Sequence, residues 1–337
     1  MMTALIELGL FSAKTFIIVF GILVVLIVFF ALISRGKDKS KGKLTIKNLN
    51  KKYAQTADAL LEKSLSKKQF KHYLKEKKTA LKLEKKQEDE KKKNIYVLQF
   101  NGDIKASAVA SLREEITAIL TVATPQDEVV VNIESAGGMV HGYGLAAAQL
   151  MRVRAKNIPL TVTIDKVAAS GGYLMACIAN KILCAPFAIV GSIGVIVQLP
   201  NFHRLLKEKN IDFEQLTAGE YKRTLTMFGE NTEAGREKLH QEIEDIHQHF
   251  KNLITTYRKQ INIQQVATGE HWLGEHAITL NLVDVIQTSD DYLLENSQQA
   301  NVNVFEVSYE IKKSFLSKFS AGAREAEIVG WIRRFLP

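Results

Sequence analysis

The N-terminal part of the chain carries one long apolar run. Thr15 to Ile33 contains nineteen residues without a charge or a proline. A helix of that length rises about 28 Å, close to the ~30 Å hydrocarbon core of a bilayer. A secretory signal peptide would have a shorter apolar core and a small-residue cleavage site, whereas this run ends in Leu32-Ile33-Ser34-Arg35. The pattern predicts a single uncleaved transmembrane helix within residues 1–34, in contact with membrane lipid.

Polar positions dominate the next segment, residues 35–93. Within it, Tyr53 to Lys93 is rich in Lys, Glu, Gln, Ala and Leu, which are good helix formers, and has no deep core of its own. We therefore expect a charged, Lys-rich helical stalk that links the anchor to the part of the chain from residue 94 onward.

Short apolar runs alternate with helical periodicity from residue 94 onward. The expected strands are 95–100, 128–133 and 160–164, and the expected helices are 109–120, 145–155 and 170–178. Apolar strands separated by helices are typical of βαβ units and a largely parallel sheet. We expect this α/β domain to cover residues 94–290, followed by a strand and an amphipathic helix in residues 291–337.

A second uncharged run, Ile182 to Leu199, is also long enough to suggest a membrane span. Glycines interrupt it, Pro186 lies inside it, and Pro200 ends it. These breaks and its Val and Ile content favour buried strands joined by a turn.

Composition and charge exclude several classes of protein. With 46% hydrophobic residues and two cysteines, the chain is neither a disordered tail nor a disulfide-rich or zinc-finger domain. Of the net charge of +9, the stalk carries +13 and the anchor none, which leaves −4 for residues 94–337. Because the globular part has no basic footprint for a phosphate backbone, nucleic acid is not an expected partner.

The flanking charges bear on which side of the membrane the domain lies. Lys14 alone precedes the apolar run, while many lysines follow it, and the positive-inside rule then puts the domain in the cytoplasm. Long domains are translocated regardless of flanking charge, however, so this count does not decide the side.

Two small-residue motifs follow expected strands, where active sites of parallel sheets lie. The first, Ser135-Ala-Gly-Gly138, contains paired glycines whose exposed N–H groups suit an oxyanion hole, although an ordinary strand-to-helix turn has the same pattern. The second places Ser170 before Gly171, where a strand meets a helix. Ser170 there is either an exposed nucleophile or simply the N-cap of the helix.

A third motif is Gly219-Glu-Tyr-Lys222. A lysine is usually a solvated surface charge, but burial lowers a lysine pKa from ~10.4 towards about 7 or 8. A neutral lysine of that kind can act as general base to a serine. Nothing in the sequence indicates whether Lys222 is buried.

Five motifs in this order and spacing resemble the signal peptide peptidase A (protease IV) family of serine peptidases. They are the two glycine-serine motifs, the Tyr-Lys motif, and the segments Gly191–Val195 and Gly269–Ala277. The resemblance covers about Ile95 to Ile286. The anchor, the stalk and the run Thr217 to Lys238 place the chain closest to an inner-membrane branch of that family.

The resemblance implies a ClpP/crotonase-like fold and a membrane-anchored serine endopeptidase with a Ser-Lys dyad. Ser170 would be the nucleophile and Lys222 the general base. The Gly137 backbone N–H, with help from Gly138, would bind the oxyanion. Gly171 and Ser192 would also belong to the oxyanion and substrate site, with Ser192 beside the dyad. No cofactor and no metal is expected.

The resemblance also implies partners and a location. The substrates would be signal-peptide remnants or fragments of membrane and envelope proteins. Single-core members of the family form homo-oligomers, in which a neighbouring subunit can supply the lysine. The family favours a periplasmic active site on a bacterial inner membrane. Where the family often has Gly-Leu-Val-Asp, this chain has Asn281, the next-best residue for a left-handed helix end.

Other readings stay open at this point. A crotonase-like acyl-CoA enzyme and a membrane-tethered oligomeric scaffold without turnover are the alternatives to a peptidase. His141 follows the glycine pair closely and is a candidate for the base of a Ser-His-Asp triad, although a loop or surface position is favoured for it. His240, His247 and His249 fit a polar helix face better than a zinc site. Cys177 and Cys184 fit core packing.

Overall fold

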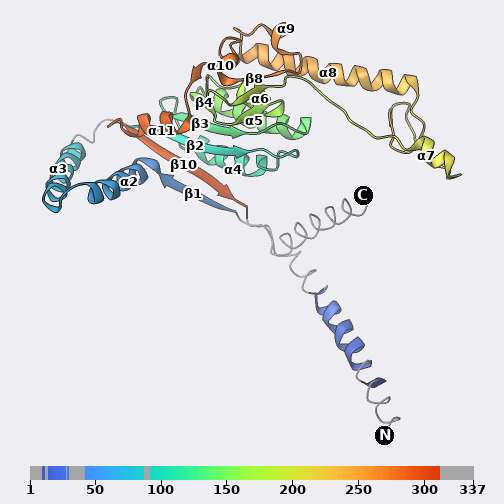
Figure 1. Cartoon of the computed structure of the whole chain (residues 1–337), viewed down its shortest axis with the longest axis horizontal. Helices are drawn as coiled ribbons and strands as arrows, with labels where there is room; N and C mark the ends of the chain where they lie inside the picture. Colours follow the sequence, from blue (N-terminus) through green and yellow to red (C-terminus); the bar gives the residue numbers. More distant parts are fainter. Residues whose placement is uncertain (1–9, 12–13, 28, 30–41, 87–91, 312–337) are drawn as a thin grey trace. The chain divides into compact units, whose positions relative to one another are not determined.

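The structure is a computed structural model that describes residues 10–11, 14–27, 29, 42–86 and 92–311 (Figure 1). The chain divides into two compact units, one of residues 44–309 and one of residues 1–43 with 310–337. Residues 14–27 of the latter are helical. Within the described part of the chain, no helix combines the length and the apolar character needed to cross a membrane. Residues 28 and 30–33 of the predicted span lie outside that part, as does the predicted C-terminal amphipathic helix.

A parallel sheet forms the centre of the unit 44–309. Its seven strands lie in the order β1-β10-β2-β3-β4-β6-β9, and every pair from β10 to β9 is parallel. In chain order these strands are β1 (Lys43–Asn48), β2 (Lys93–Asn101), β3 (Glu128–Glu134), β4 (Leu160–Ile164), β6 (Lys181–Cys184), β9 (Val285–Ile286) and β10 (Val302–Glu310). The predicted α/β class with a largely parallel sheet is confirmed.

A smaller sheet of three strands lies beside the main one. Its strands are β5 (Val167–Ala169), β7 (Ile189–Gly191) and β8 (His271–Leu273), with β5 parallel and β8 antiparallel to β7. A single parallel bridge between Ser135 and Ala168 joins the end of β3 to β5. This bridge brings the segment after β3 next to the segment after β5.

Ten helices lie in the described residues 42–86 and 92–311, and Figure 1 shows α4, α5 and α6 next to the strands. They are α2 (Leu49–Ser64), α3 (Lys67–Lys86), α4 (Val109–Leu120), α5 (Val140–Ala155), α6 (Gly171–Ala176), α7 (His203–Glu208), α8 (Glu233–Tyr257), α9 (Ile263–Val266), α10 (Gly274–Ala277) and α11 (Ser289–Ser297). The longest, α8, begins where the Thr232 side chain accepts a hydrogen bond from the Gly235 N–H, at 3.1 Å. Such an N-cap satisfies one of the backbone donors that a helix start leaves unpaired.

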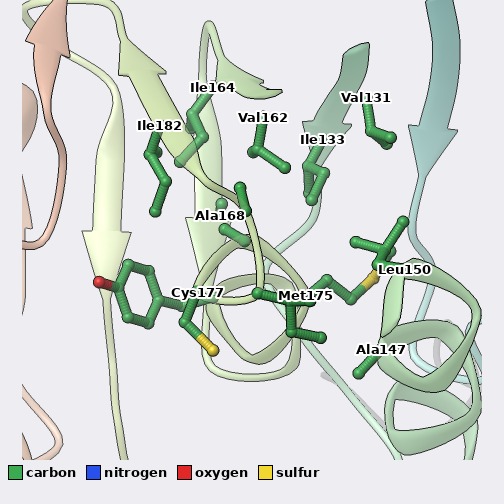
Figure 2. Packing of buried hydrophobic residues seen from close by; sticks show 14 of the residues in the cluster. Val131, Ile133, Ala147, Leu150, Val162, Ile164, Ala168, Met175, Cys177 and Ile182 are labelled. Atoms are coloured by element: carbon green, nitrogen blue, oxygen red, sulfur yellow. The ribbon is translucent and has the colours of Figure 1, made fainter. Parts of the chain in front are cut away.

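Side chains alternate between the two faces of the main sheet, as the strand period of two requires. In β3, Val129, Val131 and Ile133 join the large core cluster, whereas Val130 joins a smaller cluster on the other face. Figure 2 shows Val131 and Ile133 facing helical side chains that include Leu150 and Met175. The core therefore fixes α5 and α6 against the strands that carry the motifs.

The start of the predicted stalk belongs to the sheet. β1 pairs with β10, and Leu49 is buried in the smaller cluster. The Asn50 side chain donates to the carbonyls of Ser297 and Val302 and accepts from the Val304 N–H. Residues 43–50, which the sequence analysis assigned to the helical stalk, thus form a strand and a helix start that are anchored to the sheet.

The uncharged run Ile182 to Leu199 contains buried strands, as predicted, but only in its first half. β6, β7 and Ile193 are largely buried. Residues 195–202 have no regular structure, and the Ile196 side chain is 77% exposed. The expectation of burial was wrong there, because no strand or helix of the described chain covers these apolar side chains.

Candidate active site

Ser170 lies at a tight turn between β5 and α6. Its backbone dihedrals are φ 51° and ψ −118°, a region that side chains other than glycine rarely adopt. The turn is held by a hydrogen bond of 2.8 Å from the Ser170 N–H to the Gly191 carbonyl. Strained backbone of this kind persists only where the surrounding structure enforces it, and it is typical of catalytic serines on strand-to-helix turns.

The side chain of Ser170 is not used as a helix cap. Ser170 occupies the N-cap position of α6, but it makes no side-chain capping hydrogen bond. It is half-buried, and the helix behind it is fixed by the Tyr173 hydroxyl, which donates to the Leu282 carbonyl at 2.9 Å. Of the two interpretations left open by the sequence, the capping role therefore has no support in the geometry.

The paired glycines lie directly against Ser170. Gly137 has φ +92°, and a Cβ on it would come within 2.8 Å of both the Ser170 Cβ and the Gly171 N. A Cβ on Gly138 would meet the Ile104 carbonyl oxygen at 2.2 Å. Only glycine permits this close approach between the loop after β3 and the turn after β5. The structure thus brings Gly137, Gly138, Ser170 and Gly171 together.

The backbone amides of this loop are not equivalent. The Gly137 N–H donates to the Ser135 Oγ at 3.1 Å. The N–H groups of Gly138 and Gly171 donate to no atom of the described residues. The amides that remain open for an anionic oxygen are therefore those of Gly138 and Gly171, whereas the expectation was that Gly137 would be the main donor.

An apolar cavity of about 430 Å³ opens beside Ser170. Apart from the glycines and Ser170, its walls come from α5, α6, α8 and the segment after β7. Its apolar lining includes Val140, Met151, Leu174, Val195, Ile196, Ile246, Phe250 and Leu253. A cavity of this size and chemistry fits one large apolar side chain of a bound chain.

Ser192 is a second serine with a left-handed backbone, at φ 51°. Its N–H donates to the Glu270 carbonyl at 2.6 Å, which joins β7 to the segment before β8. It follows Gly191, whose carbonyl accepts the Ser170 N–H, so Ser192 lies one residue from the hydrogen bond that holds the Ser170 turn.

Lys222 does not share the Ser170 cavity. It is exposed and lines a separate cavity of about 760 Å³ that is formed by residues 199 and 213–228. That segment also exposes large apolar side chains, among them Leu216 at 97% and Phe213 at 44%. The structure therefore brings the serine and the glycines together but leaves the lysine outside the Ser170 cavity of the same chain.

Comparison with known sequences identifies the family. Residues 3–150 match the model of "Peptidase family S49 N-terminal", and residues 152–303 match that of "Peptidase family S49". The "Probable protease SohB" of Haemophilus influenzae is 47% identical over 329 residues, which cover 93% of each chain. The chain belongs to peptidase family S49.

More distant S49 relatives and solved structures also match. "Protease 4" of Salmonella typhi is 26% identical over 183 residues, 54% of this chain and 29% of that one. A membrane-bound stomatin-specific protease, 1510-N, solved with a substrate peptide, aligns with 69% of this chain and 99% of its own at 15% identity and a TM-score of 0.43. The family assignment rests on the sequence matches, which confirm the predicted family and place the chain nearest its SohB-type members.

One residue that lines the Ser170 cavity was missed from the sequence. His249 lines the Ser170 cavity together with Ile246, Phe250 and Leu253, although the sequence analysis assigned it to a polar helix face. The spacing of these four residues at i, i+3, i+4 and i+7 was a readable signal for one face of α8. His141, by contrast, is exposed on α5 and does not line the cavity, as favoured from the sequence.

Both cysteines pack in the core. Cys177 and Cys184 are free and buried, and burial raises the pKa of each thiol to about 12. A thiol with so high a pKa is a poor nucleophile at neutral pH. The expected packing role is confirmed.

Proposed function

We propose that this S49 peptidase is a membrane-anchored serine endopeptidase in which Ser170 is the nucleophile. The observation that carries the proposal is the strained, uncapped Ser170 turn, which lies against a glycine loop and opens onto an apolar cavity. A strand-to-helix serine with open backbone amides beside it is the arrangement that acyl transfer requires.

The chemistry follows in two halves. A neutral Lys222 amine takes the Ser170 hydroxyl proton while Oγ bonds to the scissile carbonyl carbon, and the resulting oxyanion accepts hydrogen bonds from the Gly138 and Gly171 N–H groups. The lysine then gives its proton to the leaving amine as the peptide bond breaks. Water, deprotonated by the same lysine, attacks the acyl-enzyme and regenerates Ser170. One oxyanion donor of this kind is worth about 10² to 10³ in rate.

Lys222 is proposed to act on the Ser170 of a neighbouring copy. Two observations support this arrangement. The lysine and the serine line different cavities of one chain, and the segment that carries Lys222 exposes apolar side chains such as Leu216, at 97%. Packing against a second copy would cover these side chains and desolvate the lysine, which favours the neutral amine that a general base needs.

The substrates are proposed to be extended segments with a large apolar residue before the scissile bond, as in signal-peptide remnants and membrane-protein fragments. The apolar walls of the 430 Å³ cavity support this choice. A fold of the ClpP/crotonase type, an anchor at Thr15 to Ile33 in a bacterial inner membrane, and a periplasmic catalytic domain complete the proposal. Digestion of the domain by external protease in spheroplasts would support that side, and protection would contradict it.

The deciding experiment uses the detergent-solubilised full chain. Wild type, Ser170→Ala and Lys222→Ala are treated with a fluorophosphonate probe and assayed for casein hydrolysis. We expect only the wild type to turn over casein and Ser170→Ala to lose labelling. Mixing the two inactive variants before assembly should restore partial activity, because one copy then supplies the serine and another the lysine.

Each result bears on one part of the proposal. Hydrolysis that persists in Ser170→Ala would exclude Ser170 as the nucleophile. Activity in Lys222→Ala would exclude that base. Two inactive variants that fail to complement each other would place serine and lysine in the same subunit.

A further inference from the structure

A buried chain of hydrogen bonds runs from the glycine loop into the core. The Gly137 N–H donates to the Ser135 Oγ at 3.1 Å, and the Ser135 Oγ contacts the Tyr143 hydroxyl at hydrogen-bonding distance. The Tyr143 hydroxyl in turn lies 2.8 Å from the Asp103 carbonyl oxygen. Ser135 is 2% exposed and Tyr143 is 1% exposed, so no bulk water competes for these groups.

The direction of every hydrogen in this chain is determined. A carbonyl oxygen only accepts, so the single Tyr143 hydrogen must go to Asp103. The Tyr143 oxygen then accepts the hydrogen of Ser135, and a lone pair on the Ser135 oxygen accepts the Gly137 N–H. Because each group has one hydrogen to give, loss of any member leaves a buried partner unpaired.

We propose that Ser135 and Tyr143 are positioning residues for the oxyanion hole of the Ser170 site, an inference that rests on the function proposed above. They hold the Gly137 N–H away from the substrate and thereby fix the conformation of the loop. Gly137 at φ +92° is free to adopt other backbone conformations once that bond is lost. The fixed loop presents the neighbouring Gly138 amide, which has no partner in the described chain, to the developing oxyanion.

The Tyr143 ring has a second role that must be separated from the hydroxyl. A Cβ on Gly171 would meet ring atoms of Tyr143 at 2.4 Å, and the ring also lines the Ser170 cavity. Tyr143→Phe retains the ring and removes only the hydroxyl. Ser135→Ala interrupts the same chain one member nearer to Gly137 and does not touch the cavity wall.

The test compares Tyr143→Phe, Ser135→Ala and the double variant in the full chain. A fluorogenic peptide with an apolar residue before the scissile bond gives kcat and KM, and the matching peptide aldehyde, which forms a tetrahedral oxyanion adduct with the serine, gives an inhibition constant. We expect kcat to fall about 10- to 100-fold, less than for loss of a direct oxyanion donor. Aldehyde binding should weaken by a similar factor while KM stays within about twofold.

Two controls separate positioning from stability and from the proposed function. Tyr292→Phe removes a part-buried hydroxyl bond, 2.6 Å to Glu128, from a ring that packs against the smaller core cluster, and should lower the melting temperature without lowering kcat. Ser170→Ala should be inactive. Full activity in Ser170→Ala would overturn the proposed function and this inference together.

Other outcomes overturn the positioning role alone. Because the hydrogen bonds lie in series, the double variant should have about the same kcat as the less active of the two single variants. A kcat loss in the double variant equal to the product of the two single losses would contradict a common chain of hydrogen bonds. An unchanged kcat in Tyr143→Phe would also contradict it. A higher kcat in Ser135→Ala would mean that Gly137 itself is the oxyanion donor.

Discussion

The Arg258 guanidinium is buried and forms a double ion pair with Asp284. Its Nη1 lies 2.7 Å from Oδ2 and its Nη2 lies 2.8 Å from Oδ1 of that carboxylate. Asp284 also accepts from the Ile182 N–H at 2.7 Å. The pair ties the C-terminal end of α8 to the start of β6, and so holds in place the helix that lines one wall of the Ser170 cavity.

Replacement of Arg258 by Met should be severely destabilising. The substitution leaves the half-buried Asp284 carboxylate without its counter-charge, which costs up to about 3 to 5 kcal/mol. Urea unfolding followed by circular dichroism measures the loss. The double variant Arg258→Met with Asp284→Asn should be more stable than the single one, because it removes the unpaired charge. Equal stability of the two would show that the charge is not the cause.

Glu115 makes stability depend on pH in an unusual direction. It is 5% exposed on α4 and accepts a hydrogen bond from the Tyr309 N–H at 2.7 Å. Burial raises the pKa of its carboxyl from 4.5 to about 7. The folded chain therefore holds a proton that the unfolded chain has released, and stability falls as the pH rises through that window, by on the order of 3 kcal/mol.

Glu115→Gln should remove this dependence, because an amide keeps the acceptor for Tyr309 and has no charge. Urea unfolding at pH 5 and pH 8 should show the wild type losing stability relative to the variant at the higher pH. A constant difference between the two proteins at both pH values would exclude Glu115 as the source.

Gly137→Ala should abolish activity. The added Cβ would meet the Ser170 Cβ and the Gly171 N, both at 2.8 Å, and would force the loop away from Ser170. Gly269→Ala is a matched control, since Gly269 also has a positive φ, +87°, but nothing lies within 4 Å of its Cβ position. The control should lose only about 1 to 2 kcal/mol of stability and should keep its turnover. Similar kinetics in both variants would contradict the close packing against Ser170.

The two cysteines should be inert in the folded protein. Both thiols are buried, with a pKa of about 12, so iodoacetamide should label neither at pH 8. Labelling of both should appear in 8 M urea, which serves as the positive control. Rapid labelling of the native chain would mean that the core around α6 opens readily.

The regular elements could be read from the sequence because their periods are local. The Val and Ile runs of β2, β3 and β4 were recognised as strands, and Asn281 has the left-handed φ of 58° expected for it. The burial of Leu49 and the exposure of Ile196 could not be predicted in this way. Each depends on what a distant segment does or does not cover.

The sequence by itself determined the family, the parallel α/β core and the serine and glycine motifs, because these follow from local patterns and from motif order. Only the tertiary structure decided that the Ser170 side chain is not a helix cap, that the Gly137 amide is held by Ser135, and that Lys222 lines a different cavity from Ser170. The physical reason is that hydrogen bonds and cavities join residues far apart in the chain. Residue spacing alone carries no information on which of those partners meet.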